Sequence, residues 1–424
     1  MYLLIIIILA YFLLLGYPMF MPLIGCTLII MSLYAPGLDL VIVVQQSIHG
    51  VSAYVLLALP MFIFAADIMS KGHTANRLVD LVKAYFGHIY GGLAITVAGA
   101  CTLFGAISGA ANSTVVAVGK PMRQRMIESG YDADNTDALI ISASTIAALI
   151  PPSIMMIIYC IMTGSSVGDL FIAGIFPGVL LFVLFALYNY YHARKNNIPR
   201  TPRTTFKEKL VITRKSLLAL GFPVIIVAGI YSGTFSPTEA AAVAVLYAVI
   251  CEMLIYKTVK PKDLYSIALS TGTITVAIFI LIAVGQAFTW MITFMQIPQM
   301  ITTAVVGTDP SKIKIILVVA SFFFICCMFV DQVVAMIILL PILFPMAAKA
   351  GIDPIYMGVI VSVQAALGCI TPPFGSNIFV AAVAFDRPYL KIVKGIPTYL
   401  LIFILASILL ILVPELSTFH RYFK

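Results

Sequence analysis

Two stretches decide the fold: Ile150-Pro151-Pro152-Ser153 and Thr371-Pro372-Pro373-Phe374-Gly375-Ser376-Asn377. Each Pro-Pro pair lies inside a long apolar run. A proline inside a helix removes a backbone donor, clashes with the preceding turn and moves the residue before it out of helical geometry. Each stretch therefore predicts a helix that is broken near its middle. Irregular backbone at membrane depth is tolerated only where it is buried in protein or lines a polar cavity, so two broken helices in corresponding positions predict a transporter binding site.

The sequence around the two breaks repeats. A glycine, an aspartate and the first proline recur at the same two spacings: Gly130, Asp132 and Pro151, then Gly351, Asp353 and Pro372. Downstream, Leu170 to Pro177 matches Leu390 to Pro397 with one residue of slippage. We therefore predict an internal repeat over roughly 100–180 and 320–400. Spacing leaves open whether the repeat is inverted or parallel, because that depends on the number of spans in between.

Composition defines the class of protein. Apolar residues make up 62% of the chain and charged residues 10%, and the mean hydropathy is +1.10. Soluble domains carry about a quarter charged residues. At about 20 residues per span, the chain has room for roughly a dozen spans or half-spans. These values predict an all-α polytopic integral membrane protein, since a membrane barrel would show short alternating strands instead.

The net charge of +8 predicts membrane orientation rather than nucleic-acid binding. Lysine and arginine concentrate in short polar loops, as the positive-inside rule expects. The densest cluster lies in 194–215, and a second basic loop, 257–262, follows two apolar segments later. Both loops are therefore predicted on the cytoplasmic side of the membrane. The segment Met1 to Leu15 is apolar from the start and is predicted to be a first span rather than a removed signal peptide.

We expect five segments along the chain. They are N-terminal scaffold spans with an interfacial helix (1–90), a first transport repeat (91–191), a basic loop with scaffold spans (192–312), a second transport repeat (313–395) and a last span with a tail (396–424). Residues 71–90 carry apolar residues at helical spacing among charges, which is typical of an amphipathic helix on the membrane surface.

Each repeat contains a candidate re-entrant hairpin before its broken helix. The first tip is the small-residue tract Gly105-Ala106-Ile107-Ser108-Gly109-Ala110-Ala111-Asn112-Ser113-Thr114. Small residues are also common where helices pack closely, so the residues alone leave both interpretations open. The second candidate hairpin covers 313–349, with Asp331 and Gln332 between two apolar runs.

Asp331 is the leading candidate for a functional group, because an ionisable residue at membrane depth is costly and marks a site by default. It could help to hold sodium or relay protons, or it could be a hairpin-tip carboxylate satisfied by backbone donors. Sodium is a hard cation that prefers oxygen ligands. Oxygen-bearing side chains near the two breaks are Ser108, Asn112, Ser113, Ser142, Ser144, Thr145, Asp331, Gln364 and Thr371.

The breaks also predict an anion site. Helix N-termini attract anions, and Ser153, Ser376 and Asn377 stand just past the prolines, where the second halves of the broken helices begin. The sequence has no phosphate-binding loop, no His-Glu-x-x-His and no nucleophile elbow, so an enzyme is not expected. These features favour a secondary transporter for a small anion coupled to a cation.

The chain resembles the large membrane subunit of tripartite ATP-independent periplasmic (TRAP) transporters. The stretches that carry the resemblance include Ala58-Leu59-Pro60-Met61-Phe62, Gly87-His88-Ile89-Tyr90-Gly91-Gly92-Leu93, Phe104-Gly105-Ala106-Ile107-Ser108-Gly109, Ile150-Pro151-Pro152-Ser153, Ser236-Pro237-Thr238-Glu239-Ala240-Ala241-Ala242 and Thr371-Pro372-Pro373-Phe374-Gly375. They run most of the length of the chain in this order.

The resemblance implies an elevator-type transporter with two inverted repeats and sodium symport of an organic acid, such as a four-carbon dicarboxylate or a sialic acid. It also implies two protein partners: a small four-helix membrane subunit and a periplasmic protein that delivers the substrate. The alternatives are a self-sufficient sodium–anion symporter and, from another class, a channel or scaffold without coupled transport.

Carried over to this sequence, the resemblance places one sodium site around the first hairpin tip and the break before Pro151, and the other around Asp331 and the second break. The predicted sodium-site residues are Ser108, Gly109, Asn112, Ser113, Ser144, Thr145, Pro151, Asp331, Gly368, Thr371 and Pro372. The predicted substrate-site residues are Pro152, Ser153, Pro373, Ser376 and Asn377. Thr371 corresponds to Ile150 in the other repeat, so the two sodium sites need not be equivalent.

Overall fold

The computed structural model describes residues 7–8, 11–12, 15–307 and 310–419. In this part of the chain the regular elements are helices, and no strand occurs. Seven of the described helices are long and apolar enough to cross a membrane. The all-α polytopic class predicted from composition is therefore confirmed. Most of the predicted first span, Met1 to Leu15, lies outside the described residues.

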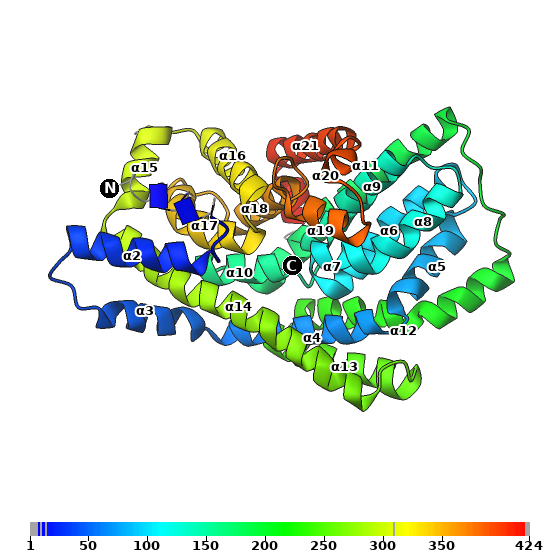
Figure 1. The fold of residues 1–424 in the computed structure, drawn as a ribbon, viewed down its shortest axis with the longest axis horizontal. Coiled ribbons are helices and arrows are strands. Elements are labelled where there is room, and N and C mark those ends of the chain that lie inside the picture. Colours follow the sequence, from blue (N-terminus) through cyan, green and yellow to red (C-terminus); the bar gives the residue numbers. More distant parts are fainter. Residues whose placement is uncertain (1–6, 9–10, 13–14, 308–309, 420–424) are drawn as a thin grey trace.

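One side of the molecule is built from helices outside the repeats. Their bounds are α2 (Phe20–Tyr34), α3 (Val41–Val51), η1 (Tyr54–Leu57), α4 (Ala58–Lys71), α5 (Thr74–Phe86), α12 (Phe206–Tyr231), α13 (Pro237–Val249), η4 (Ile250–Ile255), α14 (Pro261–Phe294) and α15 (Ile297–Val306). Helix α14 runs along this side, α2 and α3 pack on it, and α4 packs against α13 and α14 (Figure 1). Helix α15 lies apart from the others, beside α16 and α17 of the second repeat (Figure 1). We call the remaining helices of this set the scaffold. The amphipathic helix predicted in 71–90 is α5, but its apolar residues, such as Leu78 and Val79, are buried, and the helix packs on α6 and α12. Its apolar face is therefore covered by protein and not by a membrane surface.

The first repeat is a helical hairpin followed by a broken helix and a long span. Its elements are α6 (Gly92–Ser108), α7 (Ala111–Thr114), η2 (Val115–Gly119), α8 (Lys120–Glu128), α9 (Ala133–Ser144), η3 (Thr145–Ala148), α10 (Ile154–Thr163) and α11 (Val167–Lys195). The hairpin turns at Gly109, whose φ is +60°. On α6, Gly105 crosses η3 so closely that a Cβ would lie 2.6 Å from the Cα of Ala147. Both interpretations of the small-residue tract are therefore correct: it holds a hairpin tip and a close helix crossing.

The second repeat has the same order of elements. They are α16 (Lys312–Phe329), α17 (Gln332–Lys349), α18 (Pro354–Gly368), α19 (Ser376–Ala384), α20 (Tyr389–Val393), α21 (Ile396–Leu412) and α22 (Glu415–Thr418). The hairpin turns at Val330 and Asp331, as expected for 313–349. The broken helix is formed by α18 and α19. The two repeats together fill the other side of the molecule in Figure 1; we call them the transport body.

Both breaks occur at the proline pairs. Helical structure stops at Ala148 and resumes at Ile154 in the first repeat, and it stops at Gly368 and resumes at Ser376 in the second. Both Pro-Pro peptide bonds are cis. Single prolines have a weaker effect, because Pro177 lies inside the continuous helix α11. A single proline removes one backbone hydrogen bond, whereas adjacent prolines remove two and constrain a longer stretch of chain.

The residues that suggested the repeat perform the same tasks in both halves. Gly130 and Gly351 precede the broken helices with positive φ values of +88° and +63°. Asp132 Oδ2 then accepts a hydrogen bond from the backbone of Asn135 (2.9 Å), which caps α9. Asp353 Oδ1 caps α18 in the same way, at 2.8 Å from the backbone nitrogen of Ile355. The spacing match therefore reflects one local structure formed twice.

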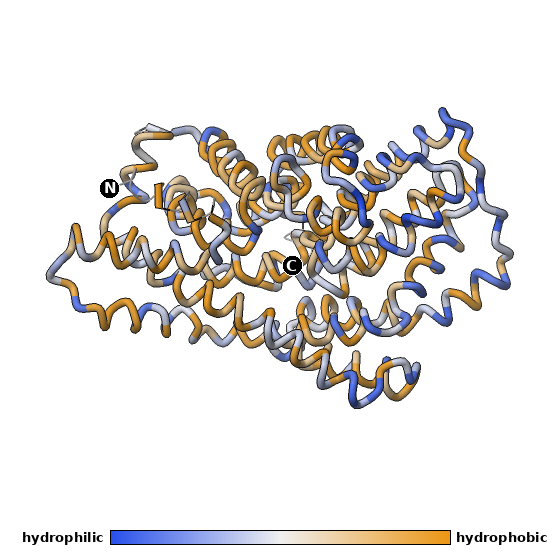
Figure 2. Tube along the Cα trace, in the orientation of Figure 1, coloured by the Kyte–Doolittle hydropathy of each residue, from blue (hydrophilic) through white to orange (hydrophobic). Residues whose placement is uncertain are grey.

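The repeats are inverted. Between the two hairpins the chain crosses through α9–α10, α11, α12, α13 and α14, an odd number of crossings. The second hairpin therefore enters from the side opposite to the first. The basic connections α11–α12 and α13–α14 fall on one side by the same count. Figure 2 shows the α11–α12 connection and the adjoining helix ends as hydrophilic. The positive-inside rule predicts that this end of the molecule faces the cytoplasm.

Candidate functional site

The two hairpin tips and the two breaks meet at one cavity. Its volume is about 300 Å³. The described residues that line it are Gly109, Ala110, Ala111, Asn112, Ile154, Met155, Ile274, Ala277, Ile278, Leu281, Asp331, Gln332, Val333, Ser376 and Asn377. Both repeats thus contribute a hairpin tip and a helix start, and the scaffold helix α14 closes the cavity with apolar side chains.

Three helix N-termini form the polar part of the wall. Helices α10, α17 and α19 begin at the cavity with Ile154, Gln332 and Ser376. The first backbone N–H groups of a helix have no partner within the helix, and the helix dipole makes this end positive. The arrangement is therefore suited to an anionic group of a small ligand.

Asp331 places one carboxylate at this wall. It is the N-cap of α17, and its Oδ1 accepts a hydrogen bond from the backbone of Val333 (2.9 Å). The side chain is exposed to the cavity. Among the described residues that line the cavity, Asp331 is the only ionisable one, and none is Lys, Arg or His. A carboxylate in this position can neutralise a bound cation.

The predicted sodium-site residues fall into two groups. Gly109, Asn112 and Asp331 line the cavity. Most of the hydroxyl residues lie behind this wall and donate to nearby carbonyls, as Ser144 does to Ile140 (2.7 Å) and Thr371 does to Leu367 (2.7 Å). The remaining donors behave alike: Thr145 donates to Ser142, and Ser108 to Ala110. Their oxygens keep lone pairs that can still accept or coordinate.

The remaining predicted sodium-site residues do not line the cavity, and several of them shape the backbone beside it. Ser113 is exposed and does not line the cavity, and Pro151 is buried. At Gly109, a Cβ would overlap the carbonyl oxygen of Pro152, so the first hairpin tip rests directly on the first break. In the second repeat, a Cβ at Gly368, just before Pro372, would lie 2.5 Å from that of Cys327 on the hairpin. Each hairpin therefore contacts its own broken helix through a glycine.

The predicted substrate-site residues divide in the same way. Ser376 and Asn377 line the cavity, and the buried Asn377 amide nitrogen has no hydrogen-bond partner in the described part of the chain. Ser153 is buried and donates to the carbonyl of Ala148 (2.7 Å), which closes the end of η3. Pro152 is buried and Pro373 exposed, and neither lines the cavity. An unpaired buried donor is costly, so Asn377 is poised to bind an acceptor from a ligand.

Two features of the site escaped the sequence reasoning. One is the wall from α14, contributed by Ile274, Ala277, Ile278 and Leu281, which reads in the sequence as an ordinary apolar span. The other is Gln332, which follows Asp331 and lines the cavity. Because Gln332 interrupts an apolar run, the same signal that identified Asp331 was available for it.

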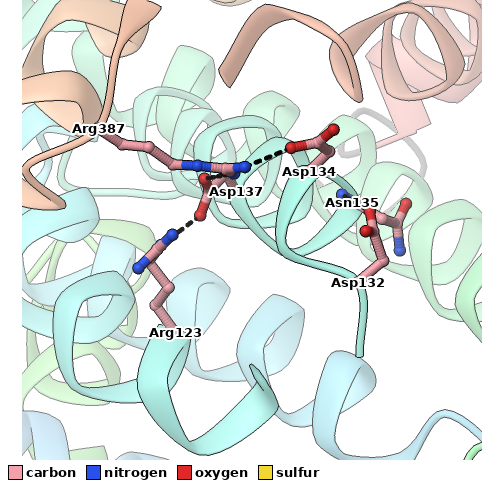
Figure 3. A network of polar contacts seen from close by, with 6 residues as sticks. All are labelled: Arg123, Asp132, Asp134, Asn135, Asp137 and Arg387. Carbon is pink, nitrogen blue, oxygen red and sulfur yellow. Dashed lines mark hydrogen bonds and ion pairs between the residues drawn. The ribbon is translucent and has the colours of Figure 1, made fainter. Parts of the chain in front are cut away.

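A buried ion-pair network lies outside the cavity and joins the two repeats (Figure 3). Asp137 of α9 accepts from Arg123 Nε of α8 and from Arg387 Nη1, in the α19–α20 connection, each at 2.5 Å. Arg387 Nη2 also donates to Asp134 at 2.5 Å. Burial opposes the charge of Arg387, but the hydrogen bonds and charges of Asp137 and Asp134 outweigh it and raise the pKa of Arg387. The network fixes the first hairpin to both broken helices.

Comparison with known proteins identifies relatives along the whole chain. The family model described as "Tripartite ATP-independent periplasmic transporter, DctM component" matches residues 6–416. The chain is 47% identical to the ectoine TRAP transporter large permease protein TeaC of Halomonas elongata, over 96% of both chains. It is 38% identical to the C4-dicarboxylate TRAP transporter large permease protein DctM of Pseudomonas aeruginosa, over 86% of this chain and 85% of that one.

More distant similarities extend the comparison. The sialic acid TRAP transporter permease protein SiaT of Haemophilus influenzae is 30% identical over 88% of this chain and 61% of its own length. Among solved structures, the YdaH transporter of Alcanivorax borkumensis superimposes with a TM-score of 0.66 at 16% identity, covering 96% of this chain and 97% of that one. The last similarity concerns the fold alone.

Proposed function

Because the chain belongs to the DctM-component family of tripartite ATP-independent periplasmic transporters, we propose that it is the subunit through which a small carboxylate-bearing solute crosses the inner membrane, driven by sodium. The observation that carries this proposal is the single cavity at which both hairpin tips and both breaks meet. Family membership makes it a multi-pass transporter permease of the bacterial inner membrane.

The substrate we propose is a zwitterionic solute of the ectoine class. Ectoine carries one carboxylate and one delocalised amidinium in a small ring, so it is neutral overall. The described residues lining the cavity include no Lys, Arg or His, so a four-carbon dicarboxylate would find no side-chain cation there. The carboxylate of a zwitterion can accept hydrogen bonds from the Asn377 amide and from the backbone N–H groups at the helix N-termini. Relatives at 47% identity are named for ectoine, whereas those named for dicarboxylate or sialic acid are 30–38% identical.

Sodium coupling is the second part of the proposal. Asp331 and the oxygen-bearing groups behind the cavity wall lie at the contacts between each hairpin and its break. A cation bound at such a contact would order the hairpin tip and complete the substrate cavity. We propose further that the transport body moves against α14 as an elevator, because α14 presents only apolar side chains to the cavity, and the polar bonds described for it, such as that of Thr271 to Asp67 (2.8 Å), stay within the scaffold.

The partners we propose are a small four-helix membrane subunit and a periplasmic substrate-binding protein. Support comes from the family, whose description names a tripartite system. The scaffold also exposes apolar side chains, such as Leu269 and Val276 on α14, to the surrounding membrane or a membrane partner.

We expect sodium-driven uptake of labelled ectoine when the chain is reconstituted in liposomes with its small subunit and binding protein. Unlabelled ectoine should inhibit the uptake, whereas equal concentrations of succinate or sialic acid should leave most of it uninhibited. Omitting either partner is expected to abolish uptake. Competition by succinate at lower concentration than ectoine would contradict the substrate class. Uptake by the chain without partners would favour the self-sufficient symporter.

We expect the purified protein to melt at a higher temperature in sodium chloride than in choline chloride of equal ionic strength. A ligand that binds only the folded state raises the free energy of unfolding by about 2.7 kcal/mol when its concentration is a hundred times its Kd. Asp331→Asn should lose most of this increase, and the control Asp39→Asn, at an exposed helix start, should retain it. An equal increase in potassium chloride would refute a sodium-specific site.

A further inference from the structure

The α11–α12 connection and the first turns of α12 carry a concentrated positive charge. The basic residues of this segment are Arg194, Lys195, Arg200, Arg203, Lys207, Lys209, Arg214 and Lys215. Its one acidic residue, Glu208, accepts hydrogen bonds from the backbone and hydroxyl of Thr205 (2.9 and 2.8 Å). Among the described residues, none of these eight bases forms an ion pair. Arg200 and Lys209 lie over the rings of Tyr90 and Tyr85, and the charge of the other six is available to a ligand outside this chain.

Contacts with α5 fix the start of α12 in place. Thr213 hydrogen-bonds to Tyr85 (2.9 Å), and the hydroxyl of Ser216 donates to the backbone of Arg77 (3.1 Å). The ammonium of Lys209 lies 5.2 Å from the ring centre of Tyr85, and this cation–π contact directs it toward α5. One face of α12 is therefore occupied, and the other is left open.

The open face of α12 combines positive charge with apolar side chains. Lys207 and Arg214 are seven residues apart, so they lie on the same side of the helix about 10.5 Å from one another. Next to them, Phe206, Leu210 and Leu217 are 83%, 62% and 61% exposed. Cytoplasmic orientation requires the charge, but it requires neither the apolar neighbours nor a fixed helix.

We propose that this open face binds the headgroups of anionic phospholipids in the cytoplasmic leaflet. The phosphate would contact Lys207 and Arg214, and the acyl chains would extend along α12 past Leu217, toward the middle of the span. Juxtamembrane basic side chains attract anionic lipid in this way. The site lies where the transport body, through α11, connects to the scaffold, through α12, so bound lipid would hold the scaffold at a fixed depth while the transport body moves.

The test measures phosphatidylglycerol binding to the purified protein by native mass spectrometry and by the melting temperature. The variant Lys207→Gln/Arg214→Gln keeps the rest of the basic segment, so the membrane orientation is preserved. At about 1 kcal/mol for each basic side chain near an anionic surface, its affinity should fall roughly thirtyfold. The matched control, Lys257→Gln/Lys262→Gln, removes two charges from the other cytoplasmic loop and should retain binding.

Four results would overturn the proposal. Phosphatidylcholine could stabilise the protein as much as phosphatidylglycerol, or the control pair could lose as much binding as the test pair. Inorganic phosphate alone could give the same shift, which would make the site one for a soluble anion. Finally, the test pair could lose the small membrane subunit and not the lipid, which would make this face a protein interface. Raising the salt concentration should weaken the expected interaction, since exposed charges are screened.

Discussion

Asp137→Ala is expected to lower the melting temperature of the purified protein by several degrees and to reduce its yield. The Asp137 carboxylate is fully buried, and its two oxygens accept from Arg123 and Arg387 (Figure 3). Without it, Arg123 has no carboxylate within the described residues, and Arg387 keeps only Asp134. Removing one partner of a fully buried ion pair costs about 3–5 kcal/mol. Because the side chains of Arg123 and Arg387 are 21% and 16% exposed, we expect a smaller loss here.

Two controls separate the ion-pair network from a general loss of packing. Asp134→Asn should have a much smaller effect, because its side chain is 31% exposed and Arg387 retains Asp137. Replacing the buried charges together, in Arg123→Met/Asp137→Leu/Arg387→Met, should recover much of the stability, since apolar groups can substitute for a whole buried network. Thermal unfolding in detergent measures all three. An Asp137→Ala protein that melts with the wild type would show that the network contributes nothing.

Within the described residues, the network has no counterpart at the equivalent position of the second repeat. At the sequence offset that relates Asp132 to Asp353, Asp137 corresponds to Gly358. A Cβ at Gly358 would lie 2.7 Å from the ring of Tyr159, whose hydroxyl donates to the carbonyl of Pro354 (2.7 Å). At this position the first repeat contacts the second through the ion pair of Asp137 with Arg387. At the equivalent position the second repeat contacts the first through Gly358, on which the ring of Tyr159 packs. Because the repeats are inverted, the two junctions lie at opposite ends of the molecule, and the basic loops predict that the ionic junction is at the cytoplasmic end.

The features of this fold that could be predicted from the sequence are those set by residues close together in the chain. The proline pairs predicted both breaks because a proline lacks the backbone N–H that a helix needs, and its effect is confined to the neighbouring turn. Gly130 and Gly351 marked equivalent turns for the same reason, since both adopt positive φ. Charge in the loops predicts which end of the molecule faces the cytoplasm, and the count of crossings puts both basic connections at that one end. Each of these signals depends on residues close together in the chain.

The rest of the site depends on contacts between distant residues. Arg387 and Asp137 pair across 250 positions, and no pattern within either segment specifies the other. The role of the hydroxyl residues was also difficult to predict. Thr371 was predicted to bind sodium, but its hydroxyl also bonds to the carbonyl four residues before it, an option open to any threonine in a helix. Sequence alone therefore located the hairpin tips and breaks, and not which of their oxygens face the cavity.

Gly109→Ala is expected to reduce sodium-dependent stabilisation and uptake by roughly tenfold or more, with the protein still folded. The residue has a φ of +60°, where a side chain costs about 1–2 kcal/mol. Its Cβ would also overlap the carbonyl oxygen of Pro152, so the hairpin tip would have to move away from the break. Each 1.4 kcal/mol lost from binding weakens it tenfold, and the displaced tip is part of the cavity wall.

Gly164→Ala is the matched control for this prediction. Gly164 has nearly the same φ, +70°, and also ends a helix, but nothing lies within 4 Å of a Cβ built there. Both variants therefore carry the same backbone strain, and only Gly109→Ala disturbs the contact between hairpin and break. Equal sodium responses in the two variants would show that this contact is not needed for cation binding. A response lost only in Gly109→Ala would assign the sodium-sensitive step to the junction of the first hairpin tip with the first break.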